Sequence, residues 1–292
     1  MAWIQITTSV AEALAEPLSD MLTEIGAVSV TFTDAKDEPI YEPDIGTTPI
    51  WSLTKVTGLF DAEVNAKIII EMLQTNMIEL AEQHFKVEAI EDKDWVREWM
   101  DQFQPMQFGE NLWIVPSWLE APNPEATNLM LDPGMAFGTG THPTTAMCLE
   151  WLDANPPAEK TVIDYGCGSG VLALAAEKLA ALSVKGTDID PQAIQASIQN
   201  AERNQATIAF ALVKDFESEP VDLLIANILS GPLKELAPEF DRLVKPGGEL
   251  VLSGLLTTQA DELIEHYKQF GFKLDQLQTQ DEWARLSGRK VR

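Results

Sequence analysis

Hydrophobic and polar positions in the first ninety residues follow two different periods, and each change of period predicts a new element. Trp3 to Thr7 alternates apolar and polar side chains as a strand does, whereas Glu12 to Ile25 repeats Leu, Met and Ile at helical spacing and ends at Gly26. The order of elements, β-α-β-β-α-β, is that of a ferredoxin-like α+β domain, which we expect over residues 1–90. The other elements predicted here are Val28–Thr33, Trp51–Phe60, Ala62–Leu73 and Phe85–Ile90.

The stretch EDKDWVREWMDQFQPM separates this part from the rest of the chain. Trp95, Trp99 and Phe103 recur at i, i+4 and i+8, which places them on one face of a helix. An aromatic stripe at this spacing is typical of packing in a core or between domains. We therefore predict a linker helix over residues 91–105.

From about Thr127 the pattern changes to strands and helices that alternate one by one. Such alternation predicts a doubly wound, mostly parallel α/β sheet with ligands at the carboxyl ends of its strands, and we expect this domain over residues 106–292. The predicted strands are Thr161–Tyr165, Ser183–Thr187, Ile208–Val213, Val221–Asn227, Glu249–Gly254, Phe272–Gln278 and Trp283–Gly288. The predicted helices are Thr144–Leu152, Gly170–Ala180, Pro191–Asn204, one near Pro232–Leu243, and Thr258–Phe270.

The charge of the chain narrows the class of partner. The 292 residues carry a net charge of -26, and about 22 acidic against 6 basic residues lie up to Glu120. Nucleic acid is disfavoured as a direct partner, because phosphate binding requires clustered Lys and Arg. A basic protein would be attracted instead, so we interpret the acidic first domain as a docking domain. A packing appendage whose acidity only serves solubility is the alternative.

The cysteines and the hydropathy pattern indicate where the protein works. Cys148, Cys167 and three histidines offer neither a disulfide framework nor a zinc-ligand cluster, which predicts no metal and fits the reducing cytoplasm. The start MAWIQITTSV lacks the features of a signal peptide, and no apolar stretch approaches the ~20 residues of a membrane span. We expect a cytoplasmic monomer with no membrane partner.

In the stretch TVIDYGCGSGVLALAAEK a predicted strand turns into a helix. Gly166, Gly168 and Gly170 are spaced Gly-x-Gly-x-Gly, whereas dinucleotide-binding turns prefer Gly-x-Gly-x-x-Gly. Asp164 precedes the turn, and its carboxylate would repel a pyrophosphate but suit a ligand that is cationic there, such as the amino-acid and sulfonium part of S-adenosylmethionine. A nicotinamide oxidoreductase is disfavoured for these two reasons.

Polar residues also end the next three strands. Asp188 is placed to accept hydrogen bonds from both ribose hydroxyls, Asp215 could accept from an adenine amino group, and Asn227 points at the reacting centre. Any one of them alone is more often a helix cap or a loop residue. Four polar residues at the ends of four successive strands form a constellation, and together they predict a cofactor site.

The same motifs resemble a known family. LDPGMAFGTGTHPTT, VIDYGCGSGVLALAA, GTDIDPQAI, NAERN and ANILSGPLKELAP are similar to the PrmA family of class I methyltransferases, and the similarity extends to the acidic first domain and EDKDWVREWM. The resemblance implies a substrate-recognition domain, a linker helix and a Rossmann-like catalytic domain. It also implies that S-adenosylmethionine methylates the N-terminal α-amine and lysine ε-amines of the large-subunit ribosomal protein at the stalk base, with S-adenosylhomocysteine as product. The family's cofactor positions fall on Thr145, Gly166, Asp188 and Asn227, and Gly168 lies in the same turn.

Methylation of an amine requires a neutral nitrogen held in line with the sulfonium methyl. Neutralising a lysine of pKa near 10.4 at pH 7 costs about 4–5 kcal/mol, whereas an α-amine near 7.8 costs about 1 kcal/mol, so the α-amine is the easier nucleophile. The sequence offers no obvious catalytic base. We expect the side-chain oxygen of Asn227 and the backbone carbonyl of Ile228 to accept the amine N–H groups, while the proton is lost to solvent.

Several alternatives stay open. The stretch FGTGTHPTT is either a structural turn or a lid over the cofactor, and His142 within it could be a general base, although a structural or cofactor-packing role is favoured. Cys167 lacks a basic neighbour that would make it a nucleophile. The alternative functions are a methyltransferase for another protein or a small-molecule amine, and a non-catalytic assembly factor that binds S-adenosylmethionine.

Overall fold

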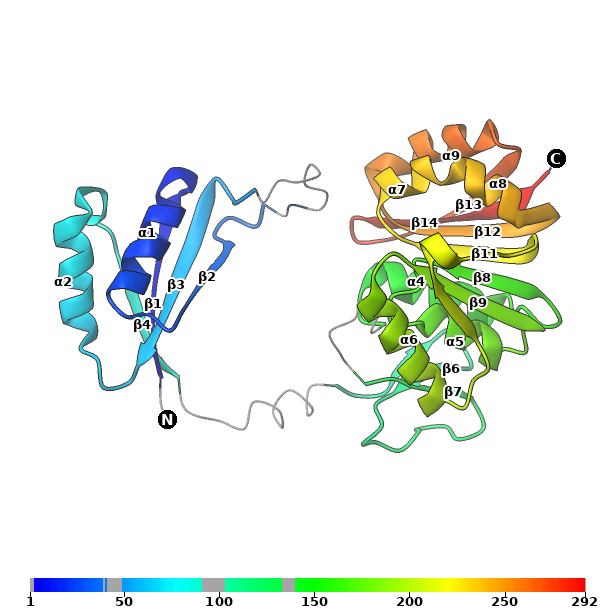
Figure 1. Ribbon diagram of the computed structural model, residues 1–292, viewed down its shortest axis with the longest axis horizontal. Helices are drawn as coiled ribbons and strands as arrows, with labels where there is room; N and C mark the ends of the chain where they lie inside the picture. The colour runs from blue at the N-terminus through cyan, green and yellow to red at the C-terminus, as the bar shows by residue number, and fades with distance from the viewer. Residues whose placement is uncertain (1–2, 39, 41–48, 91–102, 133–139, 292) are drawn as a thin grey trace. The chain divides into compact units, whose positions relative to one another are not determined.

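A computed structural model describes residues 3–38, 40, 49–90, 103–132 and 140–291 (Figure 1). The chain divides into two compact units, Met1–Met100 and Asp101–Arg292. The predicted linker helix falls mainly on residues 91–102, which lie outside the described residues, and the described remainder, 103–105, is in neither a helix nor a strand. Among the helices that the structure describes, none is long and apolar enough to cross a membrane.

The first unit is an antiparallel four-stranded sheet with two helices. Its strands lie in the order β2-β3-β1-β4, so that the first and third strands occupy the centre. This order and the β-α-β-β-α-β sequence confirm the ferredoxin-like prediction. The elements are β1 Trp3–Ala11, α1 Glu12–Glu24, β2 Ser29–Asp34, β3 Leu53–Asp61, α2 Ala66–Asn76 and β4 Lys86–Ile90, with a 3₁₀ helix η1 over Ile78–Leu80.

The two faces of this sheet differ because side chains alternate along each strand. Alternate residues of β1, such as Ile6 and Val10, are buried in one apolar cluster with residues of α1 and α2, so both helices cover the same face. The intervening positions are polar, and the hydroxyls of Thr7 and Thr57 lie 3.0 Å apart across β1 and β3. The first unit therefore has one core, built on the face that carries the helices.

The second unit is a seven-stranded, mostly parallel sheet in the order β10-β9-β8-β11-β12-β14-β13, in which only β13 and β14 pair antiparallel with their neighbours. This order confirms the doubly wound class I methyltransferase fold. The strands are β8 Thr161–Tyr165, β9 Ser183–Asp188, β10 Ala209–Leu212, β11 Val221–Asn227, β12 Val244–Leu256, β13 Phe272–Gln280 and β14 Trp283–Lys290. The helices are α4 Pro143–Ala154, α5 Val171–Lys178, α6 Pro191–Arg203, α7 Ser230–Glu235, α8 Ala237–Leu243 and α9 Ala260–Lys268, with 3₁₀ helices η2 Val213–Asp215 and η3 Thr257–Gln259.

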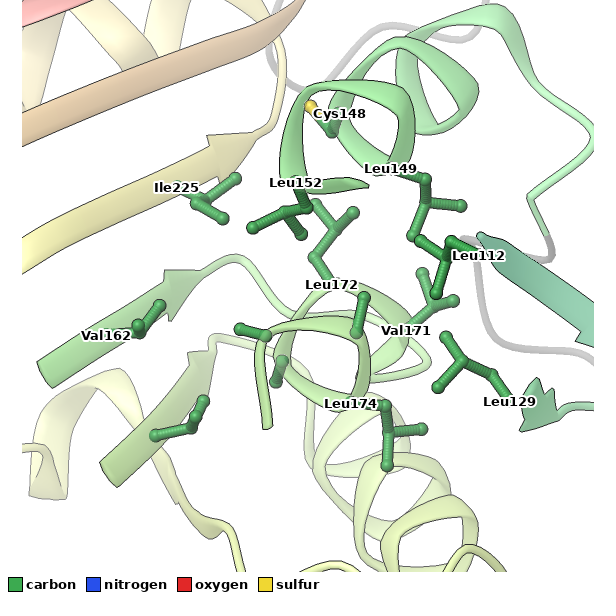
Figure 2. Packing of buried hydrophobic residues seen from close by; sticks show 14 of the residues in the cluster. Leu112, Leu129, Cys148, Leu149, Leu152, Val162, Val171, Leu172, Leu174 and Ile225 are labelled. Atoms are coloured by element: carbon green, nitrogen blue, oxygen red, sulfur yellow. The ribbon is translucent and has the colours of Figure 1, made fainter. Parts of the chain in front are cut away.

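Helices cover both faces of this sheet, so apolar side chains point to both sides of its central strands. Val162 of β8 belongs to the cluster with residues of α4 and α5, and the next residue, Ile163, belongs to the cluster with residues of α7, α8 and α9. Figure 1 shows these two groups of helices on opposite sides of the sheet. Figure 2 shows the first of these clusters, with Leu152 of α4 and Leu172 of α5 between the two helices. The sheet is thus a rigid base for the strand ends that carry the predicted site.

Two features depart from the sequence prediction. A three-stranded sheet, β5 Met106–Phe108, β6 Leu112–Val115 and β7 Thr127–Met130, precedes the α/β pattern, and its residues join the core under α4 and α5. The helix expected near Pro232–Leu243 is two helices, α7 and α8. Pro238 lies in the first turn of α8 and has no N–H to donate to the preceding turn, which explains the break.

Candidate active site

The carboxyl ends of neighbouring strands bring the predicted residues into one row. Asp188 ends β9 and Asn227 ends β11, while β8 lies between them in a parallel register that puts Gly166 next in line. Asn227 is paired in turn with Ser253 of β12. Residues that are up to 87 positions apart in the sequence therefore share one edge of the sheet.

The glycine turn after β8 adopts a backbone that other residues rarely enter. Gly166, Gly168 and Gly170 have φ values of +80°, +53° and +78°. A Cβ atom at Gly166 would also lie 2.3 Å from Cγ2 of Ile228, so the turn and the chain after β11 are in direct contact. All three positions favour glycine for conformation, and Gly166 needs it for space as well.

Asp164 lies beneath this turn and is buried. Its Oδ2 atom accepts a hydrogen bond from the N–H of Ala173 at 3.0 Å, whereas Oδ1 is buried and has no partner among the described residues. The pKa of Asp164 is raised to about 7: burial is the main cause, the N–H of Ala173 opposes the rise, and the nearby Asp188 adds to it. Asp164 is thus a carboxyl group that a cationic ligand would help to ionise.

Asp188 holds the turn from the neighbouring strand. Its Oδ2 accepts from the N–H of Gly168 at 2.9 Å, and its Oδ1 accepts from the N–H of Asp190 at 3.0 Å. Each carboxylate oxygen has a second lone pair, so Asp188 can accept from ribose hydroxyls while it keeps both bonds. Asp215 differs from the prediction in one respect: β10 ends at Leu212, and Asp215 lies on the exposed side of η2 rather than at the end of the strand.

Asn227 and Thr145 form the link between β11 and α4. The side-chain Nδ2 of Asn227 donates to Oγ1 of Thr145 at 3.1 Å, and Thr145 is fully buried in the first turn of α4. The Oδ1 atom of Asn227 is buried and has no partner among the described residues. With its N–H₂ group engaged by Thr145, Asn227 presents an unpaired acceptor.

Residues of β12 hold Ile228, the residue that follows Asn227, in place. The N–H of Ile228 donates to the carbonyl of Ser253 at 3.1 Å. Gly254, at φ +88°, lies so close behind Ile228 that a Cβ atom there would be 2.4 Å from the Ile228 carbonyl oxygen. Sequence reasoning missed Ser253 and Gly254, although the dipeptide Ser-Gly inside a run of Leu and Val was the available signal.

The surroundings of His142 and Cys167 do not favour the roles of general base and nucleophile considered for them from the sequence. His142 caps α4: its Nδ1 lies 2.8 Å from Oγ1 of Thr144, and its ring packs edge-on against Trp283 with centroids 4.8 Å apart. Burial lowers the pKa of His142, although Glu282 opposes the shift. Burial raises the pKa of the Cys167 thiol far above its usual range, so Cys167 stays protonated and is a poor nucleophile.

The chain was compared with known proteins. A family model described as "Ribosomal protein L11 methyltransferase (PrmA)" matches residues 2–291. A ribosomal protein L11 methyltransferase of Hydrogenovibrio crunogenus is 69% identical over 98% of both chains, and one of Actinobacillus pleuropneumoniae is 55% identical over 99% of this chain and 100% of its own.

Solved structures agree with the sequence comparisons. The crystal structure of a ribosomal protein L11 methylase from Lactobacillus delbrueckii subsp. bulgaricus superimposes with a TM-score of 0.60 at 31% identity. It covers 65% of this chain and 100% of the Lactobacillus chain. With the strand order and the glycine turn described above, these matches show that the chain is a methyltransferase that belongs to the PrmA family of ribosomal protein L11 methyltransferases.

Proposed function

We propose that this protein transfers methyl groups from S-adenosylmethionine to the N-terminal α-amine and lysine ε-amines of the large-subunit ribosomal protein L11, in the cytoplasm and as a monomer. One observation supports the amine site most directly: the buried Oδ1 of Asn227 has no partner among the described residues, and Ile228, with its backbone carbonyl, follows directly in the chain. Two acceptors at one place suit a neutral amine, which has N–H groups to donate and a lone pair to aim.

The residues around the glycine turn fit the cofactor that the family and the fold imply. In the part of the chain that the structure describes, one carboxylate oxygen of Asp164 has no partner, and Asp188 keeps lone pairs for hydroxyl donors. We assign Asp164, Gly166, Gly168 and Asp188 to the cofactor, together with Thr145 and Asn227 and, more peripherally on η2, Asp215. When bound, S-adenosylmethionine supplies an electrophilic methyl group on a sulfonium.

The residues of this chain position the amine, and the reaction uses its unprotonated form. An ammonium has no lone pair, so the amine must lose its proton before it can react. Near pH 7 this deprotonation costs less free energy for an N-terminal α-amine than for a lysine side chain, because the α-amine has the lower pKa. Asn227 Oδ1 and the Ile228 carbonyl would orient the N–H groups, which leaves the lone pair directed at the donor. The His142 ring is engaged as a cap, and the proton then passes to solvent.

The first unit is the proposed docking domain for the basic substrate protein. In this assignment residues 1–90 recognise the substrate, residues 91–105 connect the two domains, and residues 106–292 catalyse methyl transfer. The first unit carries a net charge of -13 on 100 residues, the same charge that the second unit carries on 192 residues. This charge density supports long-range attraction of a basic protein.

The test is intact-mass spectrometry of unmethylated ribosomal proteins incubated with the enzyme and S-adenosylmethionine. We expect mass steps of ~14 Da, the mass that one methyl substitution adds, confined to protein L11. Asn227→Ala should lower turnover by about 10²-fold, because the amine loses an oriented acceptor, whereas Asn155→Ala at the far end of α4 should not. Full turnover of Asn227→Ala with an unchanged product pattern would refute the role of Asn227, and methylation of other amines would refute the substrate.

A further inference from the structure

Ser253 is a fully buried hydroxyl in an otherwise apolar stretch of β12. Its Oγ donates to the backbone carbonyl of Thr144 at 3.0 Å, and the carbonyl of Ala284 is farther away at 3.4 Å. The Ser253 side chain also lies within hydrogen-bonding reach of the Cys148 thiol, which belongs to α4 as well. The hydroxyl therefore connects the central sheet to the first turn of α4, across 109 positions of sequence.

The backbone of the same residue holds the other side of the site. The carbonyl of Ser253 accepts from the N–H of Ile228 at 3.1 Å, directly after Asn227. The side chain holds Thr144, directly before Thr145, and Thr145 in turn accepts from Nδ2 of Asn227 at 3.1 Å. One residue thus fixes both ends of the Asn227–Thr145 hydrogen bond.

We propose that Ser253 is a positioning residue that fixes the direction of the Asn227 amide. The inference rests on the proposed role of Asn227 as acceptor for the amine. The amide can present Oδ1 only while Nδ2 is engaged, and Nδ2 is engaged only while α4 keeps Thr145 at this distance. Ser253 acts on the reaction through these two residues and does not touch the amine.

Ser287 provides a matched control in the same sheet. It is also buried, on β14, and it also hydrogen-bonds through its hydroxyl, accepting from Arg285 and donating to Gln276, both at 3.0 Å. Its partners belong to β13 and β14 and not to the site. Loss of either hydroxyl costs a buried hydrogen bond, but only one of them should affect Asn227.

The first measurement is independent of activity. In protein labelled with ¹⁵N-asparagine, Ser253→Ala should shift or broaden the side-chain amide signals of Asn227, and Ser287→Ala should leave them unchanged. Ser253→Cys keeps the shape of the side chain with a weaker donor, so its spectrum should fall between wild type and Ser253→Ala. It also keeps the test available if Ser253→Ala does not fold. Asn227 signals that are equally unaffected by all three substitutions would overturn the proposal.

The second measurement is turnover with the ribosomal protein substrate. Ser253→Ala should lower kcat about 10-fold in the wild-type background but less than 3-fold in the Asn227→Ala background, because its effect passes through that amide. Equal effects in both backgrounds would show a merely structural role and overturn the proposal. If Asn227→Ala itself retained full turnover, the proposed function of Asn227 would fail, while the amide signals would still report on the positioning by Ser253.

Discussion

Asp164 is a buried carboxyl group whose pKa is raised, and the consequence is a pH-dependent stability. Its pKa is about 7 in the folded chain, against 3.8 as the ordinary value. Between these two values the folded state holds a proton that the unfolded state has lost, so the contribution of Asp164 to stability falls as pH rises from about 4 to 7. Above pH 7 the loss is complete.

We expect Asp164→Asn to stabilise the cofactor-free second unit at pH 8 by up to about 4 kcal/mol and to have little effect near pH 4. Urea unfolding of both proteins across this range measures the difference. Asp61→Asn, which removes an exposed carboxylate of the first unit, controls for the loss of one charge. A difference that does not grow between pH 4 and pH 8 would contradict the assignment.

Gly254 offers a second test at the scale of one residue. An alanine there meets the Ile228 carbonyl oxygen at 2.4 Å and also adopts φ +88°, whereas Gly247, at φ +79°, has no atom within 4 Å of the added methyl group. Both Gly→Ala variants pay about 1–2 kcal/mol for the left-handed backbone. Only Gly254→Ala displaces the Ile228 carbonyl, so it should lose at least 10-fold in methyl transfer while Gly247→Ala keeps its activity.

Unfolding midpoints and turnover of the two variants separate the effect of the strained left-handed backbone from the effect of the clash with the Ile228 carbonyl. Equal losses of activity would mean that the position of the Ile228 carbonyl is not critical.

The site residues that could be predicted from the sequence differ in position from those that could not. Asp188 and Asn227 were predicted because they end strands, whereas Ser253 and Gly254 lie inside a strand and owe their importance to a β-bulge between Ser253 and Leu255 that only the fold reveals.

At the scale of elements, the amino end of α4 delivers Thr145 to the site. His142 caps this end: its side chain accepts from the N–H of Thr144. We expect His142→Asn, which can cap equally well, to keep turnover within about 3-fold and to leave the pH profile unchanged. His142→Ala should lower stability by about 1 kcal/mol through loss of the cap.

Thermal unfolding and pH–rate profiles of both His142 variants distinguish a role of His142 as the cap of α4 from a role as general base. A folded His142→Asn variant with turnover reduced more than 100-fold would indicate a general base instead. Since burial lowers the pKa of His142, the ring is mostly neutral at pH 7, and neutral imidazole suffices for capping.

The elements that sequence predicted well are those with a long, regular period. The alternation of β1, the helical spacing of α1 and the apolar runs of β8 and β11 each determine one structure, because burial of one face or of both leaves a clear pattern. The strands β5, β6 and β7 are three or four residues long, too short for a period to be recognised. They are held by tertiary packing against α4 and α5.

For the whole molecule, the acidic charge predicts a salt dependence. If the docking domain attracts a basic protein, raising ionic strength from 50 to 500 mM should raise KM for the ribosomal protein about 10-fold or more and leave kcat little changed, because screening weakens encounter but not the chemistry. Affinity for S-adenosylhomocysteine, measured in parallel, controls for effects on the cofactor site. A KM independent of salt would indicate that the acidity serves only solubility.

The close approach of Ile228 to Gly166 makes substitutions at these two positions depend on each other. The side chain of Ile228, which follows the proposed amine acceptor Asn227, fills the space where residue 166 would carry a Cβ atom, with Cγ2 at 2.3 Å. A smaller residue 228 would relieve the clash with a larger residue 166, although the strain of a side chain at φ +80° would remain, and a larger residue 228 has no room to expand towards the turn. If these two positions serve the amine and the cofactor as proposed, substitutions at them should be epistatic. Redesign of this enzyme for another amine would have to vary both positions together.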